Sequence, residues 1–152
     1  MKFTTSIVLY KISRNQIETV LKSVLDSNCV DKIYIIDNSP TDELSYVKDI
    51  SSLIEYIPHD NTGYGSSHNI AIKKSLELGA DYHLVLNPDI RFEPTVLSEL
   101  IDYMSFVTFF PQLIAGPIVL QSELIPQFKD MEKRKFNADN FTDGCVQAIL
   151  GL

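Results

Sequence analysis

Polar side chains that could bind a phosphate or a metal ion follow several short apolar runs of this sequence. The run 84–86 is followed by Asn87-Pro88-Asp89, and an earlier apolar run ends in Asp37. Pro88 has no N–H to offer to a neighbouring strand, so it marks the end of a strand. We therefore expect both carboxylates just beyond the carboxyl ends of strands, where open α/β sheets bind ligands.

A second candidate is the polar loop 59–69, which contains Gly63-Tyr64-Gly65 and leads into a predicted helix. Glycines let backbone N–H groups approach an anion, and the positive end of a helix adds to the attraction. The loop could hold a diphosphate, or its glycines could only serve a backbone with positive φ. It follows the third predicted strand, whereas a dinucleotide fingerprint follows the first, so a nicotinamide cofactor is disfavoured.

Each candidate side chain has a functional and a structural interpretation. Asp89 could hold Mg²⁺ or Mn²⁺ together with substrate phosphates, or it could cap the helix that follows. Asp37 could accept hydrogen bonds from a nucleobase or a ribose, or cap the next helix. His68 could donate to a phosphate, whereas His83 is expected to be structural. The three histidines and two cysteines show no zinc spacing.

Apolar periodicity predicts the elements that position these residues. Strands are expected at 5–10, 32–36, 53–57, 82–86 and 113–120. Four helices are expected: one after Ser13, a short one from Ser39-Pro40, one that ends at Gly79 and one after Pro94. In the third helix, Ala71, Ile72, Ser75 and Leu76 share one face. Ser13 and Gln16 have the spacing of a capping box. The continuous apolar run 84–86 suggests a strand buried on both faces, and the polar run 121–140 gives no clear prediction.

Alternating strands and helices predict an α/β fold with a parallel sheet. In such a sheet the carboxyl ends of all strands lie along one edge. The polar residues that follow the strands would therefore meet there, namely Tyr10, Asp37, 59–61 and 87–89. One crevice would then gather two carboxylates, a glycine loop and a helix N-terminus.

The composition of the 152 residues suits one globular domain, with 45% apolar residues and a net charge of −7. Because no basic run is present, nucleic acid is not an expected partner. Two cysteines make no disulfide framework, which favours a cytoplasmic protein. No secretory leader or transmembrane segment is recognised, and peripheral association with a membrane stays open.

Taken together, the motifs resemble family 2 glycosyltransferases of the GT-A fold, and their rhamnosyltransferase-like members in particular. The resemblance rests on Ile-Ile-Asp-Asn-Ser at 35–39, the run 61–72 and Leu-Val-Leu-Asn-Pro-Asp-Ile at 84–90, and it covers roughly residues 4–120. It implies a mostly parallel sheet in a three-layer α/β/α domain spanning 1–152. It also implies inverting transfer of a sugar from a UDP- or dTDP-sugar to a saccharide or lipid-linked acceptor.

The resemblance further implies roles for individual residues. Asp37 matches the aspartate that contacts the nucleobase, and Asp89 matches the acid that bridges the metal to the diphosphate. The expected donor-binding residues are Tyr10, Asp37, Asn38, Asn61, Gly63, Gly65, His68, Asn87 and Asp89, with Asp89 as ligand of Mg²⁺ or Mn²⁺. Asn87 replaces the first acid of the family motif, and His68 stands where many members carry an arginine.

The chain is shorter than most members of that family, so we expect it to lack most of the acceptor-binding half, of which 141–145 resembles the start. No residue can be assigned as the general base. One alternative is a truncated module that binds a nucleotide sugar without turnover. Another is a sugar-phosphate nucleotidyltransferase, for which Lys11 and Arg14 supply cations but no glycines follow the first strand. Apolar surface left open by a missing half suggests a homo-oligomer.

Overall fold

The computed structural model describes residues 2–108, 122, 125–126, 130 and 142. Contacts divide the chain into two compact units, residues 1–99 and 100–152. The predicted strand at 113–120 lies outside the described residues, as does most of the run 121–140. The expectation of a single domain over 1–152 stays a prediction.

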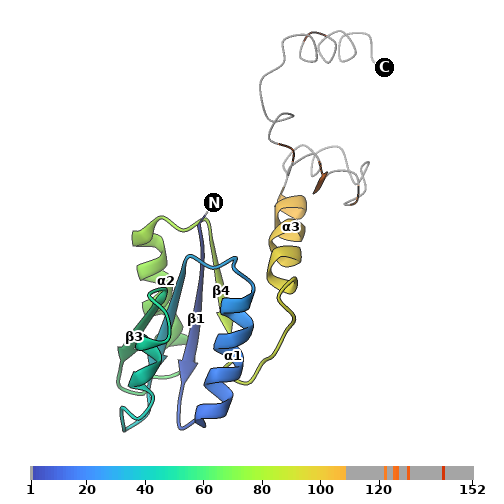
Figure 1. Cartoon of the computed structure of the whole chain (residues 1–152). Helices are drawn as coiled ribbons and strands as arrows, with labels where there is room; N and C mark the ends of the chain where they lie inside the picture. Colours follow the sequence, from blue (N-terminus) through green and yellow to red (C-terminus); the bar gives the residue numbers. More distant parts are fainter. Residues whose placement is uncertain (1, 109–121, 123–124, 127–129, 131–141, 143–152) are drawn as a thin grey trace. The chain divides into compact units, whose positions relative to one another are not determined.

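Strands and helices alternate along the described chain (Figure 1). In order they are β1 (Phe3–Leu9), α1 (Arg14–Asp26), β2 (Lys32–Asp37), the 3₁₀ helix η1 (Ser45–Asp49), β3 (Ile54–Pro58), α2 (Tyr64–Leu78), β4 (Tyr82–Leu86) and α3 (Val96–Thr108). The four strands form one sheet in the order β3-β2-β1-β4, and every neighbouring pair is parallel. The predicted α/β fold with a parallel sheet is confirmed.

The strand order reverses beside β1. The chain moves outward from β1 through β2 to β3, and then returns through α2 to the other side of β1 as β4. In open parallel sheets, ligands bind outside the carboxyl ends of the strands at such a reversal. The fold therefore directs attention to the loops that follow β1 and β4.

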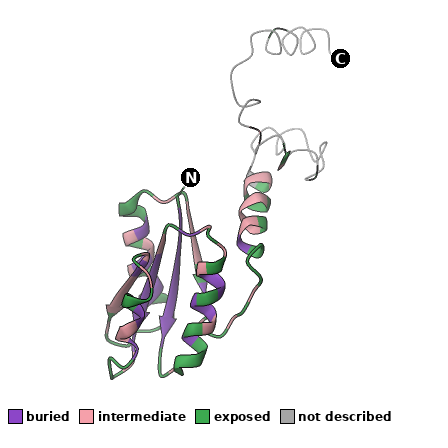
Figure 2. Cartoon of the chain, viewed as in Figure 1, coloured by how far each residue is buried: buried purple, intermediate pink, exposed green. Residues whose placement is uncertain are grey.

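Side chains of the central strands alternate between two faces, as the pleat of a strand requires. On one face, Val8, Tyr34 and Ile36 form a buried cluster with Ala71 of α2. On the other face lie Ile7, Leu9, Ile33 and Ile35, none of them exposed to solvent. Helix α1 contributes the buried residues Ile17, Val20, Leu21 and Val24. Figures 1 and 2 show α1 and α2 on opposite sides of this buried sheet.

The predicted start of α1 and the predicted end of α2 are confirmed. At the start of α1, the Ser13 side chain accepts a hydrogen bond from the Gln16 backbone, and the Gln16 side chain accepts one from the Ser13 backbone. This capping box satisfies two N–H groups that the helix itself leaves unpaired. At the end of α2, Gly79 has a φ of 72°, the left-handed conformation that glycine tolerates best.

Three local predictions are wrong. No helix begins at Ser39-Pro40: η1 starts at Ser45, and the Ser39 hydroxyl instead accepts a hydrogen bond from the Lys11 backbone N–H. Strand β4 is not buried on both faces, because the Val85 side chain is 43% exposed. Leu76 is exposed rather than part of the buried stripe of α2.

None of the described helices is long and apolar enough to cross a membrane.

Candidate functional site

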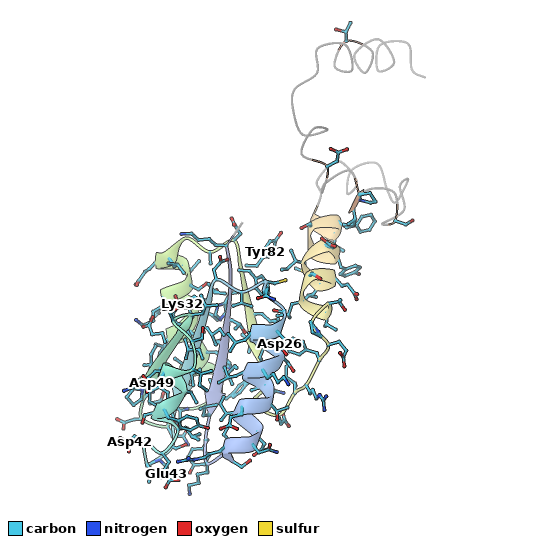
Figure 3. All side chains as sticks on the ribbon, viewed as in Figure 1. Asp26, Lys32, Asp42, Glu43, Asp49 and Tyr82 are labelled. Atoms are coloured by element: carbon cyan, nitrogen blue, oxygen red, sulfur yellow. The ribbon has the colours of Figure 1, made fainter. Side chains whose placement is uncertain are left out.

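The carboxyl ends of the four strands bring the predicted site residues to one edge of the sheet. In the strand register, Leu9 is level with Asp37, and Asp37 is level with Pro58. Two backbone hydrogen bonds of 2.9 Å continue this alignment into the loops, from Asn38 to Leu9 and from His59 to Asp37. Figure 3 shows Asp42 and Glu43 at this end and Lys32 and Tyr82 at the opposite end.

Asp37 is a buried carboxylate held by two donors. It is 2% exposed, and it accepts hydrogen bonds from the Ser39 backbone N–H at 2.9 Å and from the Tyr56 hydroxyl at 2.6 Å. Burial, together with the hydrogen bond to Asp37 and its charge, raises the pKa of Tyr56 well above its ordinary value. Tyr56 is therefore a permanent donor, and it fixes the orientation of Asp37. Sequence reasoning missed this partner on the neighbouring strand.

Asn38 joins the tip of β2 to the first turn of α2. Its Nδ2 donates to the Ser67 hydroxyl at 2.7 Å, and that hydroxyl donates to the Gly63 carbonyl at 3.1 Å. The Oδ1 atom of Asn38 is buried and has no partner within the described part of the chain. A buried acceptor without a donor is costly, so this oxygen is available to a ligand that supplies an N–H or O–H group.

The glycine turn leaves the start of α2 open. Gly63 precedes the helix with a φ of 106° and supplies no capping side chain. A Cβ atom added at Gly63 or at Gly65 would meet no atom within 4 Å. The N–H groups of a first helical turn have no partners inside the helix, so an anion can approach them here. Asn61 is exposed in the same loop.

The His68 side chain is buried beneath the first turn of α2 and does not lie in the open space at Gly63 and Gly65. It is 3% exposed, and its Nδ1 shares a hydrogen bond of 2.8 Å with the Ser6 hydroxyl of β1. Its Nε2 is buried without a partner among the described residues. Burial and the nearby His83 lower the pKa of His68, so the ring is neutral at pH 7.

A chain of buried and partly buried hydrogen bonds continues from Ser6. The Ser6 hydroxyl also contacts His83 Nε2 at 2.8 Å, and His83 Nδ1 contacts the Thr4 hydroxyl at 2.8 Å. Thr4 in turn contacts the Ser75 hydroxyl at 2.6 Å. Burial lowers the pKa of His83 as well. The sequence carried a signal for this network, since Thr4 and Ser6 interrupt a buried apolar strand.

The tip of β4 presents Asn87 and Asp89, both exposed. Asn87 Oδ1 accepts a hydrogen bond of 2.6 Å from the hydroxyl of Tyr64, the first residue of α2. Within the described residues, Asp89 forms no hydrogen bond or ion pair, and no group of three His, Cys, Asp or Glu side chains could hold a metal. A metal ion at this tip would therefore need oxygen ligands from a substrate in addition to Asp89.

A hollow of about 390 Å³ lies between the loop after β1 and the loop after β2, and Ser39, whose backbone N–H donates to Asp37, is one of the residues that line it. Its size is in the range of small-molecule sites. The residues that line it include Lys11, Arg14, Ser39 and Glu43. Tyr10, which precedes the lining residue Lys11 in the chain, is half-exposed, and the Lys11 ammonium lies 5.2 Å from the centre of its ring.

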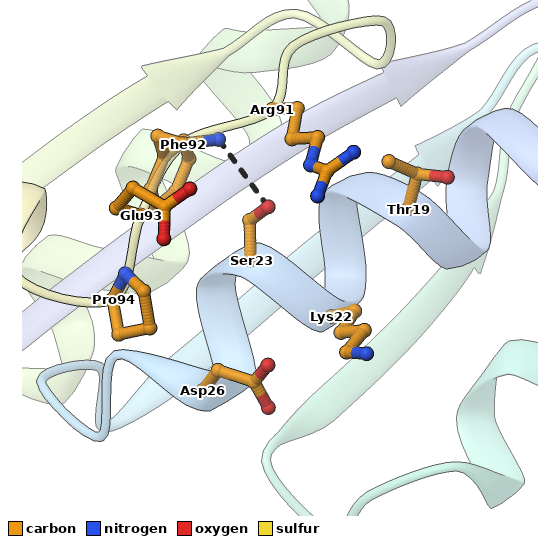
Figure 4. Close-up of a pocket in the computed structure, with 8 residues that line it drawn as sticks. All are labelled: Thr19, Lys22, Ser23, Asp26, Arg91, Phe92, Glu93 and Pro94. Atoms are coloured by element: carbon orange, nitrogen blue, oxygen red, sulfur yellow. Dashed lines mark hydrogen bonds between the residues drawn. The ribbon is translucent and has the colours of Figure 1, made fainter.

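A second hollow of the same volume lies between α1 and the segment after β4 (Figure 4). It is lined by Thr19, Lys22, Ser23, Asp26 and residues 91–94, and the Phe92 backbone N–H donates to the Ser23 hydroxyl at 3.4 Å. None of the predicted site residues lines either of these two hollows.

Comparison with known proteins gives one family and several partial relatives. Residues 6–115 match the family described as Glycosyl transferase family 2. The peptidoglycan O-acetyltransferase of Helicobacter pylori is 48% identical over 69 residues, which cover 45% of this chain and 13% of that protein. The probable alginate O-acetylase AlgI of Azotobacter vinelandii is 38% identical over 115 residues, covering 66% and 22%. The chain thus spans less than a quarter of the length of these relatives.

Among solved structures, S. aureus TarS 1-349 is similar with a TM-score of 0.56 and 18% sequence identity. The similarity covers 69% of this chain and 32% of that chain. The structure of S. aureus TarS superposes with a TM-score of 0.55 and covers 20% of that chain. These likenesses concern the fold.

Proposed function

The chain belongs to glycosyl transferase family 2, and we propose that it binds a nucleotide-diphosphate sugar at the carboxyl edge of its sheet and transfers the sugar, with inversion, to a saccharide or lipid-linked acceptor. The fold and the family agree with the resemblance read from the sequence. The observation that carries the proposal is the alignment along one edge of a buried carboxylate, an uncapped helix N-terminus and a free carboxylate.

In this proposal the nucleoside lies near Asp37 and extends toward the hollow that Ser39 and Lys11 line. The carboxylate is already oriented by Tyr56, so it can accept an N–H group of a base without first being ordered. Asn38 Oδ1 offers a second acceptor that lacks a partner in the described chain. Tyr10 offers an exposed ring against which a base can stack.

The diphosphate lies at the start of α2. The open space at Gly63 and Gly65 lets phosphate oxygens approach the backbone N–H groups, and Asn61 stands in the same loop. Because His68 is buried and neutral, we assign it support of this turn from beneath, where it packs against the ring of Tyr64.

Asp89 is the residue that would hold Mg²⁺ or Mn²⁺, with the diphosphate completing the ligands. A single exposed carboxylate fits a metal that arrives with its nucleotide, since Mg²⁺ is commonly bound by one or two carboxylates and substrate phosphates. When bound, the ion would stabilise the negative charge that develops on the departing diphosphate.

The acceptor is proposed to be a saccharide of the bacterial surface. The two O-acetylating relatives are named for peptidoglycan and alginate, which are both saccharide polymers. No general base is assigned. Cytoplasmic location, peripheral association with membranes and a homo-oligomer stay predictions, as does any likeness to rhamnosyltransferases.

Two alternatives differ in what they predict. A module that binds nucleotide sugar without turnover has the same donor site but lacks the base. A sugar-phosphate nucleotidyltransferase would form a nucleotide sugar from a nucleoside triphosphate and a sugar phosphate, and the family match to residues 6–115 counts against it.

A transfer assay tests the proposal. The purified chain is incubated with radiolabelled UDP- and dTDP-sugars, Mn²⁺ and a panel of saccharide and glycolipid acceptors, and labelled acceptor is measured. We expect the unmodified chain to transfer the sugar and the Asp89→Ala variant not to. The variant should unfold at the same temperature as the unmodified chain, because the Asp89 side chain is exposed. Donor binding without labelled acceptor would favour the binding module, and nucleotide-sugar synthesis would favour the nucleotidyltransferase.

A further inference from the structure

We propose that Tyr64 is a positioning residue, which holds the Asn87 side chain as a hydrogen-bond donor to the diphosphate rather than as a ligand of the metal ion. The inference rests on the proposed function and deepens it. It concerns a tyrosine to which neither the family motifs nor the sequence analysis gave a role.

The orientation of the Asn87 amide follows from its contact with Tyr64. The hydroxyl oxygen of Tyr64 and the Oδ1 atom of Asn87 are 2.6 Å apart. Bonds between two oxygens cluster near 2.7–2.8 Å, whereas bonds from nitrogen to oxygen cluster near 2.9–3.0 Å. The Tyr64 hydroxyl donates to the amide oxygen of Asn87, and the short distance agrees with a bond between two oxygens. The Nδ2 group then carries two N–H donors, for which the described residues supply no partner.

Tyr64 is itself held in place by the buried His68 ring. Its ring meets the His68 ring edge-on, with centres 4.4 Å apart and planes inclined by 75°. His68 is 3% exposed and is bound to the Ser6 hydroxyl, which also contacts His83 of β4. The tyrosine thus rests on a buried network that spans β1, β4 and α2, and its hydroxyl has a defined position from which to orient Asn87.

The bond joins the two parts of the proposed donor site. Tyr64 lies between Gly63 and Gly65, where the space above the backbone is open. Asn87 lies two residues before Asp89, at the tip of β4. A diphosphate between the glycine turn and Asp89 would pass Asn87, and N–H donors suit its anionic oxygens. A carbonyl oxygen facing the same anion would be repelled unless it coordinated the metal.

A double-mutant cycle tests whether Tyr64 acts through Asn87. The single variants Tyr64→Phe and Asn87→Ala and the double variant are titrated calorimetrically with UDP and dTDP. Tyr64→Phe removes one oxygen and keeps the ring against His68. We expect each single variant to bind about three- to tenfold more weakly, as loss of one hydrogen bond predicts. The double variant should be no weaker than Asn87→Ala alone.

Two further readings separate positioning from mere structural support. The factor by which saturating Mn²⁺ tightens nucleotide binding should be the same in Asn87→Ala as in the unmodified chain, because Asn87 does not ligate the metal. Tyr82→Phe, at the opposite end of the sheet in Figure 3, is the matched control and should bind like the unmodified chain. Unfolding temperatures of all variants are measured in parallel.

The possible failures are distinct. If the unmodified chain binds neither nucleotide, the proposed function fails and this inference with it. If nucleotide binds but Tyr64→Phe has no effect, or has an equal effect with and without Asn87, the positioning role is wrong. If saturating Mn²⁺ tightens nucleotide binding by a smaller factor in Asn87→Ala than in the unmodified chain, Asn87 is a metal ligand instead.

Discussion

The Tyr56 hydroxyl donates to Asp37 over 2.6 Å, so a residue of β3 sets the orientation of the carboxylate at the end of β2. The Ser39 backbone N–H holds the other oxygen of Asp37 at 2.9 Å. Each carboxylate oxygen can accept more than one hydrogen bond, so both remain able to accept from a ligand. Substitution of Asp37 therefore removes its charge, whereas substitution of Tyr56 changes only the orientation of the carboxylate.

Asp37→Ala is expected to weaken the binding of UDP and dTDP by about tenfold or more, because hydrogen bonds to charged groups contribute about 1.5–3 kcal/mol. The loss should be seen with and without Mn²⁺ in calorimetric titrations. Tyr56→Phe keeps the carboxylate and should cost less affinity. Unchanged affinity in a folded Asp37→Ala variant would exclude the nucleobase role.

Tyr56 also predicts a dependence of stability on alkaline pH. Its pKa is raised in the folded chain from 10.0, first by burial and then by Asp37. Above about pH 10 the unfolded chain therefore holds fewer protons than the folded chain, and the free energy of unfolding falls as the pH rises. Urea unfolding at pH 9 and pH 11 should show a smaller fall for Tyr56→Phe than for the unmodified chain. An equal fall in both would contradict this linkage.

Much of the fold was accessible from the sequence because local signals agreed with it. The apolar run before Asp37 and the capping box at Ser13 predicted β2 and the start of α1, and Gly79 predicted the end of α2. The exposure of Val85 on β4 could not be predicted, because an apolar run does not reveal what covers each face of a strand.

The site was predicted less completely than the fold. Residues at strand tips could be named one by one, but the bonds from Tyr56 to Asp37 and from Tyr64 to Asn87 join segments 19 and 23 residues apart. Such pairs depend on strand order and register, which no motif of this single sequence specifies. Ser39 is an example of a prediction that failed for the same reason. Its hydroxyl accepts a hydrogen bond from the Lys11 backbone N–H instead of capping a helix.

The two glycines of the turn should respond differently to alanine. Gly65→Ala adds a methyl group in open space inside a helix, so it should leave the free energy of unfolding unchanged or raise it by up to about 1 kcal/mol. The same methyl group would obstruct the approach of a diphosphate, so nucleotide affinity should fall. Gly63→Ala places alanine at a φ of 106° and should destabilise the chain by about 1–2 kcal/mol.

Urea unfolding and calorimetry of the two glycine variants separate these effects. A Gly65→Ala variant that is stable and binds nucleotide normally would show that no anion approaches the start of α2.

His68, which is buried, and His83, which is partly buried, predict a loss of stability in weak acid. Burial lowers the pKa of both His68 and His83 in the folded chain. As the pH falls through 6.5, the unfolded chain takes up protons that the folded chain resists, so the free energy of unfolding falls. Urea unfolding between about pH 7 and pH 5 should show this fall, and His68→Asn should reduce its slope. An identical slope in a folded His68→Asn variant would contradict the buried, neutral state of this ring.

The central claim is a nucleotide-diphosphate site at the carboxyl edge of the sheet, completed by a metal at Asp89. Calorimetric titration of the purified chain with UDP and dTDP, with and without Mn²⁺, tests it most directly, and Asp89→Ala is titrated alongside. We predict that at least one nucleotide binds and that Mn²⁺ tightens binding to the unmodified chain but not to Asp89→Ala. Binding of neither nucleotide under any of these conditions would contradict the claim.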